Sequence, residues 1–235
     1  MNQIYSVIGA EVEHVGLENL FDRITLVEQD QIFGACSRLR LIDSIQYTKS
    51  TFESFTQISA DALQIYMYCT CFDSLADRNI EGVGDRFRCL FNGLNKHLKD
   101  QLFQSYLFLK EPEEDFEFWE KLSPSKKLAR IIDYIYKFRR NTFTHQAKFS
   151  FTAFENRGVL ARMPIVPPNV WERYSIYFSY RFPRHSEPSL LRLIVIGKIR
   201  QMLKLEVGEE FISFYWNNLA KFYSPKSIVK TSRRV

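Results

Sequence analysis

Residues 137–145, KFRRNTFTH, place two arginines, an asparagine and a histidine close together in the chain. A histidine titrates near neutral pH, so it can take a proton from a ribose 2′-hydroxyl or give one to a leaving oxygen. An arginine carries a permanent positive charge and can donate two parallel hydrogen bonds to a phosphate, so it stabilises the phosphate while negative charge develops on it. Arg140, Asn141 and His145 therefore supply the residue types needed to cleave RNA without a metal, with Asn141 orienting the arginine or binding the substrate.

The spacing of these residues bears on how a site would be assembled. At roughly 100° per residue, Asn141 and His145 share one helix face, whereas Arg140 is offset from His145 by about 140°. The long arginine side chain covers part of that angle, and a local irregularity at Thr142 and Thr144 would help. A second copy of the helix would also complete the site across a two-fold axis. We therefore expect the catalytic site to lie at a homodimer interface.

The hexapeptide RNTFTH, residues 140–145, resembles the R-[N/D/H]-x-x-x-H signature of HEPN domains. The resemblance covers this hexapeptide and the amphipathic helix that carries it. It implies an all-α, HEPN-like fold and a dimeric, metal-independent endoribonuclease that needs no cofactor and has paired motifs lining a basic cleft. Proteins of this superfamily act as toxins of toxin–antitoxin pairs and as antiviral defence effectors, so the resemblance also implies a protein of that kind.

The resemblance also implies roles for individual residues. Arg140 would contact the scissile phosphate, Asn141 would support it, and His145 would act in proton transfer. Arg139 has no role in the motif itself, but Arg139, Lys137 and Lys148 belong to the basic segment 121–150 and are expected to bind the RNA backbone. The implied partners are RNA, a second copy of the chain, and a cognate antitoxin or nucleotidyltransferase-like protein.

A second interpretation of the same residues stays open. A basic last turn is a common helix end, because cations there interact favourably with the helix dipole. On this interpretation the Arg140 and His145 pair is incidental, and the chain is a non-catalytic helical module that binds RNA or a protein partner.

The distribution of charge agrees with a polyanionic partner. The chain of 235 residues has a net charge of +5. Residues 111–120 carry six acids and no base, whereas residues 121–150 carry eight bases against the single acid Asp133. Local positive potential attracts polyanions such as RNA, although solvated basic helices give the same pattern.

Other classes of protein find less support in the sequence. No apolar run approaches the ~20 residues that span a bilayer, and the start of the chain lacks the features of a secretory leader, so we expect a cytoplasmic protein without a membrane partner. Cys36, Cys69, Cys71 and Cys89 form no CxxC pair, and we interpret them as buried free thiols. A zinc site that includes His97 matches no known ligand spacing. The sequence thus predicts no metal site.

The hydrophobic pattern predicts a mostly helical chain, taken as one domain over residues 1–235. Leu17, Leu20, Phe21, Ile24 and Leu26 form an apolar stripe on a helix over residues 17–32. Residues 47–59 are predicted as a connection in which Ser59 caps a central helix starting near Asp61. The GxG at Gly82 and Gly84 is predicted as a turn that ends this helix.

Four more helices and one irregular region complete the prediction. Helices are expected at residues 85–110, at 189–206 and around 209–222. Another begins at Ser123 or Ser125, with Pro124 in its first turn, and leads into the RNTFTH motif. Residues 149–188 form an irregular, partly extended insertion that is rich in proline, with a strand-like segment at 174–182. The predicted architecture is therefore an all-α bundle with an insertion before its last helices.

Overall fold

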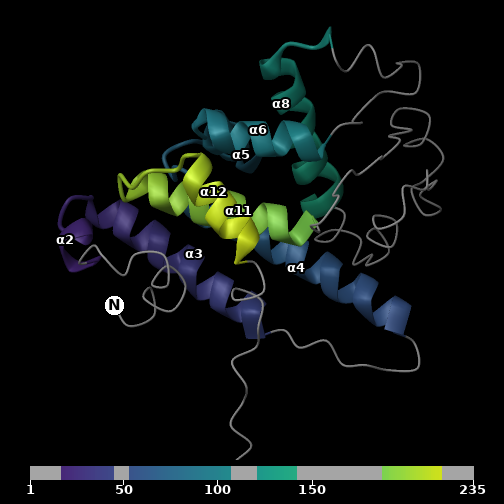
Figure 1. The fold of residues 1–235 in the computed structure, drawn as a ribbon, viewed down its shortest axis with the longest axis horizontal. Coiled ribbons are helices and arrows are strands. Elements are labelled where there is room, and N and C mark those ends of the chain that lie inside the picture. Colours follow the sequence, from purple (N-terminus) through teal and green to yellow (C-terminus); the bar gives the residue numbers. More distant parts are fainter. Residues whose placement is uncertain (1–16, 45–52, 107–120, 142–186, 219–235) are drawn as a thin grey trace, which may run out of the picture.

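A computed structural model of the chain describes residues 17–44, 53–106, 121–141 and 187–218 (Figure 1). All regular elements in these four segments are helical, which confirms the prediction of an all-α protein for this part of the chain. They are α2 (Leu17–Phe21), α3 (Leu26–Ser44), α4 (Glu53–Leu75), α5 (Val83–Asn92), α6 (Lys96–Ser105), α8 (Pro124–Asp133), the π-helix η2 (Tyr134–Asn141), α11 (Glu187–Met202) and α12 (Glu209–Asn217). The predicted insertion lies outside the described residues, except for Glu187 and Pro188, which begin α11.

Helix α4 is the centre of the fold, as the sequence predicted. It packs against α3, α5, α11 and η2, and its buried side chains include Tyr68, Cys69 and Phe72. The predicted start was wrong, because α4 begins at Glu53 and Ser59 lies inside it rather than at its N-cap. Residues 53–60 contain neither glycine nor proline, so nothing in them stops a helix from extending towards the N-terminus.

The predicted helix over residues 17–32 is interrupted between α2 and α3. Thr25 and Glu28 form a capping box, in which the Glu28 N–H donates to Thr25 Oγ1 at 3.2 Å and the Thr25 N–H donates to Glu28 Oε2 at 2.8 Å. This arrangement starts a new helix. The interruption also explains why Leu26, predicted in the apolar stripe, is 81% exposed, while Ile24 is buried.

The predicted helix over residues 85–110 consists of two helices within residues 85–106, and residues 107–110 lie outside the described residues. Gly93 is the C-cap of α5, and Asn95 is the N-cap of α6, where its Oδ1 accepts a hydrogen bond from the Leu98 N–H at 3.0 Å. The Asn95 amide also donates to the Val207 carbonyl at 2.6 Å, which holds the segment between α11 and α12 against this corner.

Helix α8 begins as predicted. Ser123 is its N-cap and accepts a hydrogen bond from the Lys126 N–H, and Pro124 follows as the first helical residue. The predicted stripe is confirmed as core at Leu128, Ile131, Ile132 and Ile135, and Tyr136 is partly buried.

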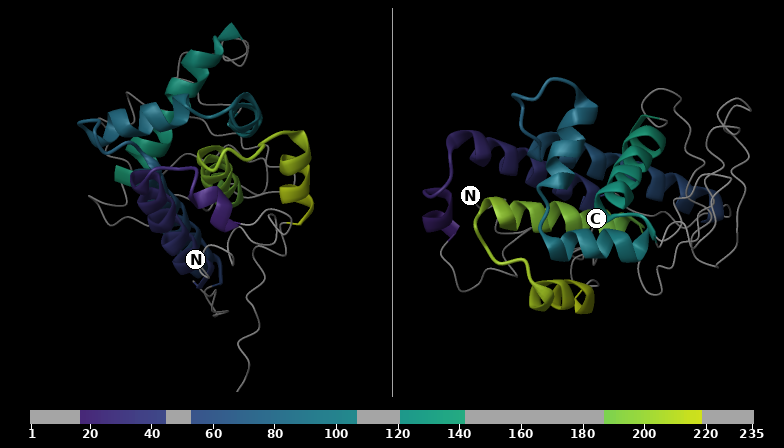
Figure 2. Two further views of the ribbon diagram at one scale, coloured as in Figure 1. Left: turned by 90° about the vertical axis from the view of Figure 1, so that its left-hand side faces the viewer. Right: turned by 90° about the horizontal axis from the view of Figure 1, so that it is seen from above.

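Helices α11 and α12 complete the described part of the bundle, with α11 lying between α12 and the α3–α4 pair (Figure 2). Nearly every position of α11 is buried, including the predicted core segment Leu193–Gly197. Two hydrogen bonds fix α12: Tyr215 Oη donates to the Ser189 carbonyl of α11 at 2.9 Å, and Trp216 Nε1 donates to Gln101 Oε1 of α6 at 2.9 Å.

Candidate functional site around Arg140

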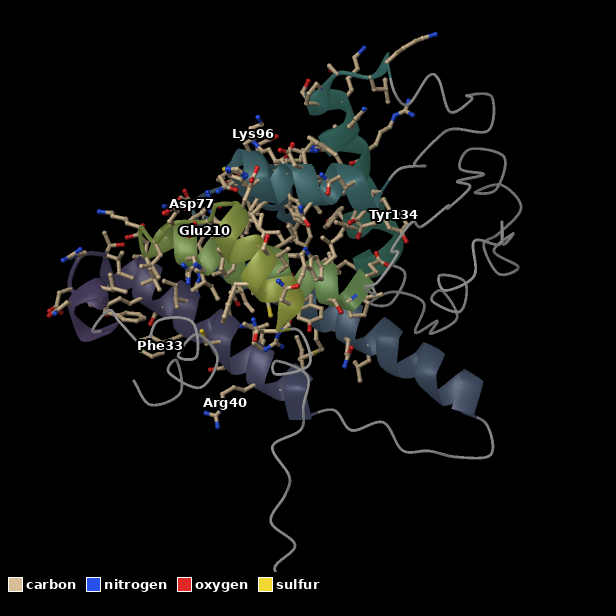
Figure 3. All side chains as sticks on the ribbon, in the orientation of Figure 1. Phe33, Arg40, Asp77, Lys96, Tyr134 and Glu210 are labelled. Atoms are coloured by element: carbon tan, nitrogen blue, oxygen red, sulfur yellow. The ribbon has the colours of Figure 1, made fainter. Side chains whose placement is uncertain are left out.

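The motif starts on η2, the π-helix that continues α8. Backbone hydrogen bonds in a π-helix join residues five apart, so each turn holds more residues than the 3.6 of an α-helix. The start of η2 is anchored in the core, because the Tyr134 ring makes an edge contact with Tyr106 at 5.8 Å between centroids (Figure 3). The change of helix type next to a candidate site is a feature that sequence periodicity did not reveal.

The described residues contain only part of the predicted site. Arg140 is described with its side chain. Asn141 ends η2 but its side chain is not described, and the same holds for Lys137 and Arg139. His145 and Lys148, like Thr142 and Thr144, lie outside the described residues.

Arg140 is paired with an aspartate that the sequence analysis did not single out. Its Nε and Nη2 atoms both lie 3.1 Å from Oδ2 of Asp73, on the central helix α4. The Arg140 side chain is 19% exposed and the Asp73 side chain 28% exposed, so the pair sits at the edge of the core. A charge-assisted pair that is partly shielded from water is stronger than a fully exposed one.

The aromatic ring of Tyr136 lies on another side of the same guanidinium. The Arg140 Cζ atom is 5.6 Å from the Tyr136 ring centroid, within the range of a cation–π contact. Tyr136 is itself held by Phe87 of α5, with 5.4 Å between the ring centroids. Three elements therefore set the position of Arg140: α4 through Asp73, η2 through Tyr136, and α5 through Phe87.

The two glycines of the GxG sequence serve this corner of the fold. Gly82 is the N-cap of α5 and has a φ of 86°, a backbone conformation that glycine adopts without strain. Gly84 lies in the first turn of α5, where a Cβ atom would meet the Tyr136 ring at 3.5 Å. The predicted turn is confirmed at Gly82 only, because Gly84 lies inside α5, where an added Cβ atom would make an ordinary van der Waals contact with the Tyr136 ring.

The surroundings of Asp73 oppose its ionisation. Burial raises the pKa of the Asp73 carboxyl above its ordinary value of 3.8, and the positive charges of Arg140, Arg38 and Arg86 partly offset this effect. The second carboxylate oxygen, Oδ1, is buried and has no hydrogen-bond partner in the described part of the chain. A buried, unsatisfied oxygen costs free energy, so this carboxylate is held in a costly position.

No family model, curated protein or solved structure matches the chain.

The remaining candidate residues show one departure from expectation. Cys36, Cys69 and Cys71 are buried free thiols as predicted, but Cys89 on α5 is exposed. Burial raises the pKa of Cys36 to about 12 and that of Cys69 well above its ordinary value of 9.0. Cys89 lies on the solvent side of an amphipathic helix, and the low average exposure of cysteine misled the prediction.

Two searches of the described residues gave negative results. In residues 17–44, 53–106, 121–141 and 187–218 there is no group of three or more histidine, cysteine, aspartate or glutamate side chains that could hold a metal ion. None of the helices in these segments is both long and apolar enough to span a membrane.

Proposed function

We propose that the protein is a metal-independent endoribonuclease of the HEPN type that acts as a toxin or antiviral defence effector. The observation that carries this proposal is the coincidence of the RNTFTH motif with the geometry of Arg140. That arginine is bound through two nitrogens to Asp73 and makes a cation–π contact with Tyr136, at the edge of the core rather than at a freely solvated helix end.

The proposed reaction is an internal transfer followed by release of the downstream RNA. A base takes the proton of the 2′-hydroxyl, the 2′-oxygen attacks the neighbouring phosphorus, and the bond from phosphorus to the 5′-oxygen breaks. The leaving oxygen takes up a proton, so the products are a 2′,3′-cyclic phosphate and a 5′-hydroxyl. His145 moves a proton at one of these oxygens, and Arg140 stabilises the charge that develops on the phosphate.

Arg140 lies next to the last residue of η2, and His145 lies outside the described residues. We propose that a second copy of the chain completes the site, with the two motifs facing each other across a two-fold axis.

Substitution of the two motif residues tests the proposal directly. His145→Ala and Arg140→Ala are each expected to slow the cleavage of RNA by about a hundredfold or more while the chain stays folded and dimeric. His97→Ala is the matched control, because His97 lies on α6, which carries no part of the motif, and this change should leave cleavage intact. Cleavage should also persist in EDTA. Activity that survives both motif substitutions, or that requires Mg²⁺, would contradict the proposal.

One observation favours a second candidate function. The ion pair with Asp73 gives Arg140 a role inside the fold, which a non-catalytic helical module that binds RNA or a protein partner would also need. Such a module would bind RNA with an affinity that falls steeply with salt, and incubation with RNA would produce no new ends. Analysis of the RNA termini after incubation separates the two candidates.

The partner of a toxin is tested in cells. We propose that a cognate antitoxin or nucleotidyltransferase-like protein holds the dimer inactive. Expression of the chain alone should then arrest growth, and co-expression of a neighbouring gene product should relieve the arrest. Arg140→Ala should remove the toxicity without any partner.

A further inference from the structure

We infer that Asp73 is a positioning residue for Arg140, which fixes the direction in which the guanidinium meets the scissile phosphate. This inference rests on the proposed function and adds to it a residue on a different helix, 67 positions before Arg140 in the chain. It assigns to α4, the central helix, a direct part in the site.

The contact between Arg140 and Asp73 has a geometry that restrains the guanidinium. Two nitrogens on one edge of the guanidinium, Nε and Nη2, share a single oxygen, Oδ2 of Asp73, with both distances 3.1 Å. Nε is bonded to the aliphatic part of the side chain, whereas Nη2 is a terminal nitrogen. A contact through both nitrogens therefore fixes the plane of the guanidinium as well as its position. A single contact at the end of the side chain would leave it free to rotate.

The contact between Arg140 and Asp73 is supported on both sides. Asp73 lies on α4 between the buried residues Phe72 and Ser74, so its backbone is held in the core. Tyr136 limits movement of the guanidinium across its face, at 5.6 Å from the ring centroid to Cζ. A charged group that is held before the substrate arrives stabilises a transition state without the cost of reorganising.

A contribution to stability alone does not explain why the Asp73 carboxylate occupies this position. Its Oδ1 atom is buried without a hydrogen-bond partner in the described residues, and burial outweighs the effect of three arginines on its ionisation. Replacing a partly buried ion pair by neutral groups is often harmless to stability. A costly charge next to a candidate catalytic group is typical of functional sites.

The experiment compares Asp73→Asn, Arg140→Ala and the double variant with the full-length wild type on one RNA substrate. Asp73→Asn should lower kcat about tenfold or more, with KM changed less than about twofold, because the orientation of Arg140 matters most in the transition state. The double variant should be no slower than Arg140→Ala, since Asp73 acts through Arg140. The melting temperature of Asp73→Asn should stay within about 3 °C of the wild type.

Two further variants make the comparison specific. Asp85→Asn removes a carboxylate that is paired with Arg88 at the surface of α5, at 2.9 Å, and should leave kcat unchanged. Arg140→Lys keeps the charge but loses the double contact, so it should be nearly as slow as Arg140→Ala. It tests the same inference if Asp73→Asn does not fold. An NMR signal of the Arg140 Nε–H group that is protected from exchange with solvent in the wild type, and lost in Asp73→Asn, reports the orientation of the guanidinium without RNA.

The outcomes separate the inference from the proposed function. A wild-type chain that cuts no RNA overturns both. If the wild type cuts RNA and Asp73→Asn, or Arg140→Lys in its place, cuts it equally well, only the inference is wrong. A double variant that is much slower than Arg140→Ala would show that Asp73 acts independently of Arg140, which also overturns the inference.

Discussion

At the scale of single residues, Asp73 makes the stability of the protein depend on pH in a defined direction. Its pKa in the fold is raised above the ordinary value of 3.8, chiefly by burial. At a pH between the ordinary pKa and the raised pKa, the Asp73 carboxyl binds more protons in the folded chain than in the unfolded chain. The wild type therefore loses stability relative to Asp73→Asn as the pH rises through this window, and the difference is constant above it.

Urea unfolding of both proteins from about pH 3 to about pH 8 measures this difference. Asp85→Asn serves as the control for removing a carboxylate, since Asp85 is exposed on α5 and paired with Arg88. A wild type that gains stability relative to Asp73→Asn with rising pH would show that the arginines, rather than burial, dominate at this site.

The four cysteines give a second prediction at this scale. Only Cys89 is exposed, whereas Cys36, Cys69 and Cys71 are buried, so iodoacetamide should add a single group to the folded protein. Intact-mass measurement should show one adduct in buffer, four in urea, and none in the folded Cys89→Ser variant. More than one adduct on the folded protein would contradict the packing of α3 against α4.

The sequence identified Arg140 as a candidate residue but gave no indication of Asp73. A motif is recognised by spacing along the chain, and the Asp73 contact joins two elements 67 residues apart. Asp73 lies on a largely apolar helix that also carries Glu53 and Asp61, and nothing local distinguishes it from an ordinary polar position. Only the packing of η2 on α4 brings the two together.

At the scale of elements, helix boundaries depended on single residues that hydrophobic periodicity does not register. The break between α2 and α3 follows from the Thr25–Glu28 capping box, and the break between α5 and α6 from Gly93 and Asn95. These signals are present in the sequence, but continuous apolar stripes ran across them. Where the cap and the stripe agreed, at Ser123 and Pro124, the predicted helix start was confirmed.

The crossing of α11 and α6 gives a prediction for a buried glycine. A Cβ atom on Gly197 would lie 2.7 Å and 2.8 Å from the two Cδ atoms of Leu98, a side chain with no exposed surface. Gly197→Ala should destabilise the fold, because an overpacking cost of about 1–3 kcal/mol exceeds the gain in helix propensity of up to about 1 kcal/mol. Urea unfolding measures the net change.

Gly34→Ala on α3 is the matched control for this prediction. Its nearest neighbour would be Nη1 of Arg38, the far end of a flexible side chain, at 3.2 Å. This change should be neutral or slightly stabilising. Leu98→Ala should lower the free energy of unfolding less in the Gly197→Ala protein than in the wild type, because it removes the clash with the new methyl group. An equal decrease in both proteins would mean that α6 and α11 do not cross closely here.

At the scale of the whole molecule, charge is separated between two parts of the fold. Residues 17–44 and 53–82, which form α2, α3 and α4, carry four arginines against ten acids, a net charge of −6. Residues 83–106 and 121–141, which form α5, α6, α8 and η2, carry eleven lysines and arginines against three aspartates, a net charge of +8. The basic part includes the candidate site, so under the proposed function an RNA strand at Arg140 would meet attractive potential along neighbouring helices.

This separation predicts which lysines contribute to RNA affinity. Lys96 on α6 and Lys126 on α8 are exposed in the basic part, whereas Arg40 is exposed on α3 and points away from the bundle (Figure 3). Lys96→Gln and Lys126→Gln should each weaken RNA binding and reduce the slope of log affinity against log salt by about one, because each contact with a phosphate releases about one counterion. Arg40→Gln should change neither quantity.

Fluorescence anisotropy at several salt concentrations, in the Arg140→Ala background to suppress cleavage, measures both the affinity for RNA and its dependence on salt. An equal effect of all three substitutions would mean that net charge, rather than a basic surface, determines the binding of RNA.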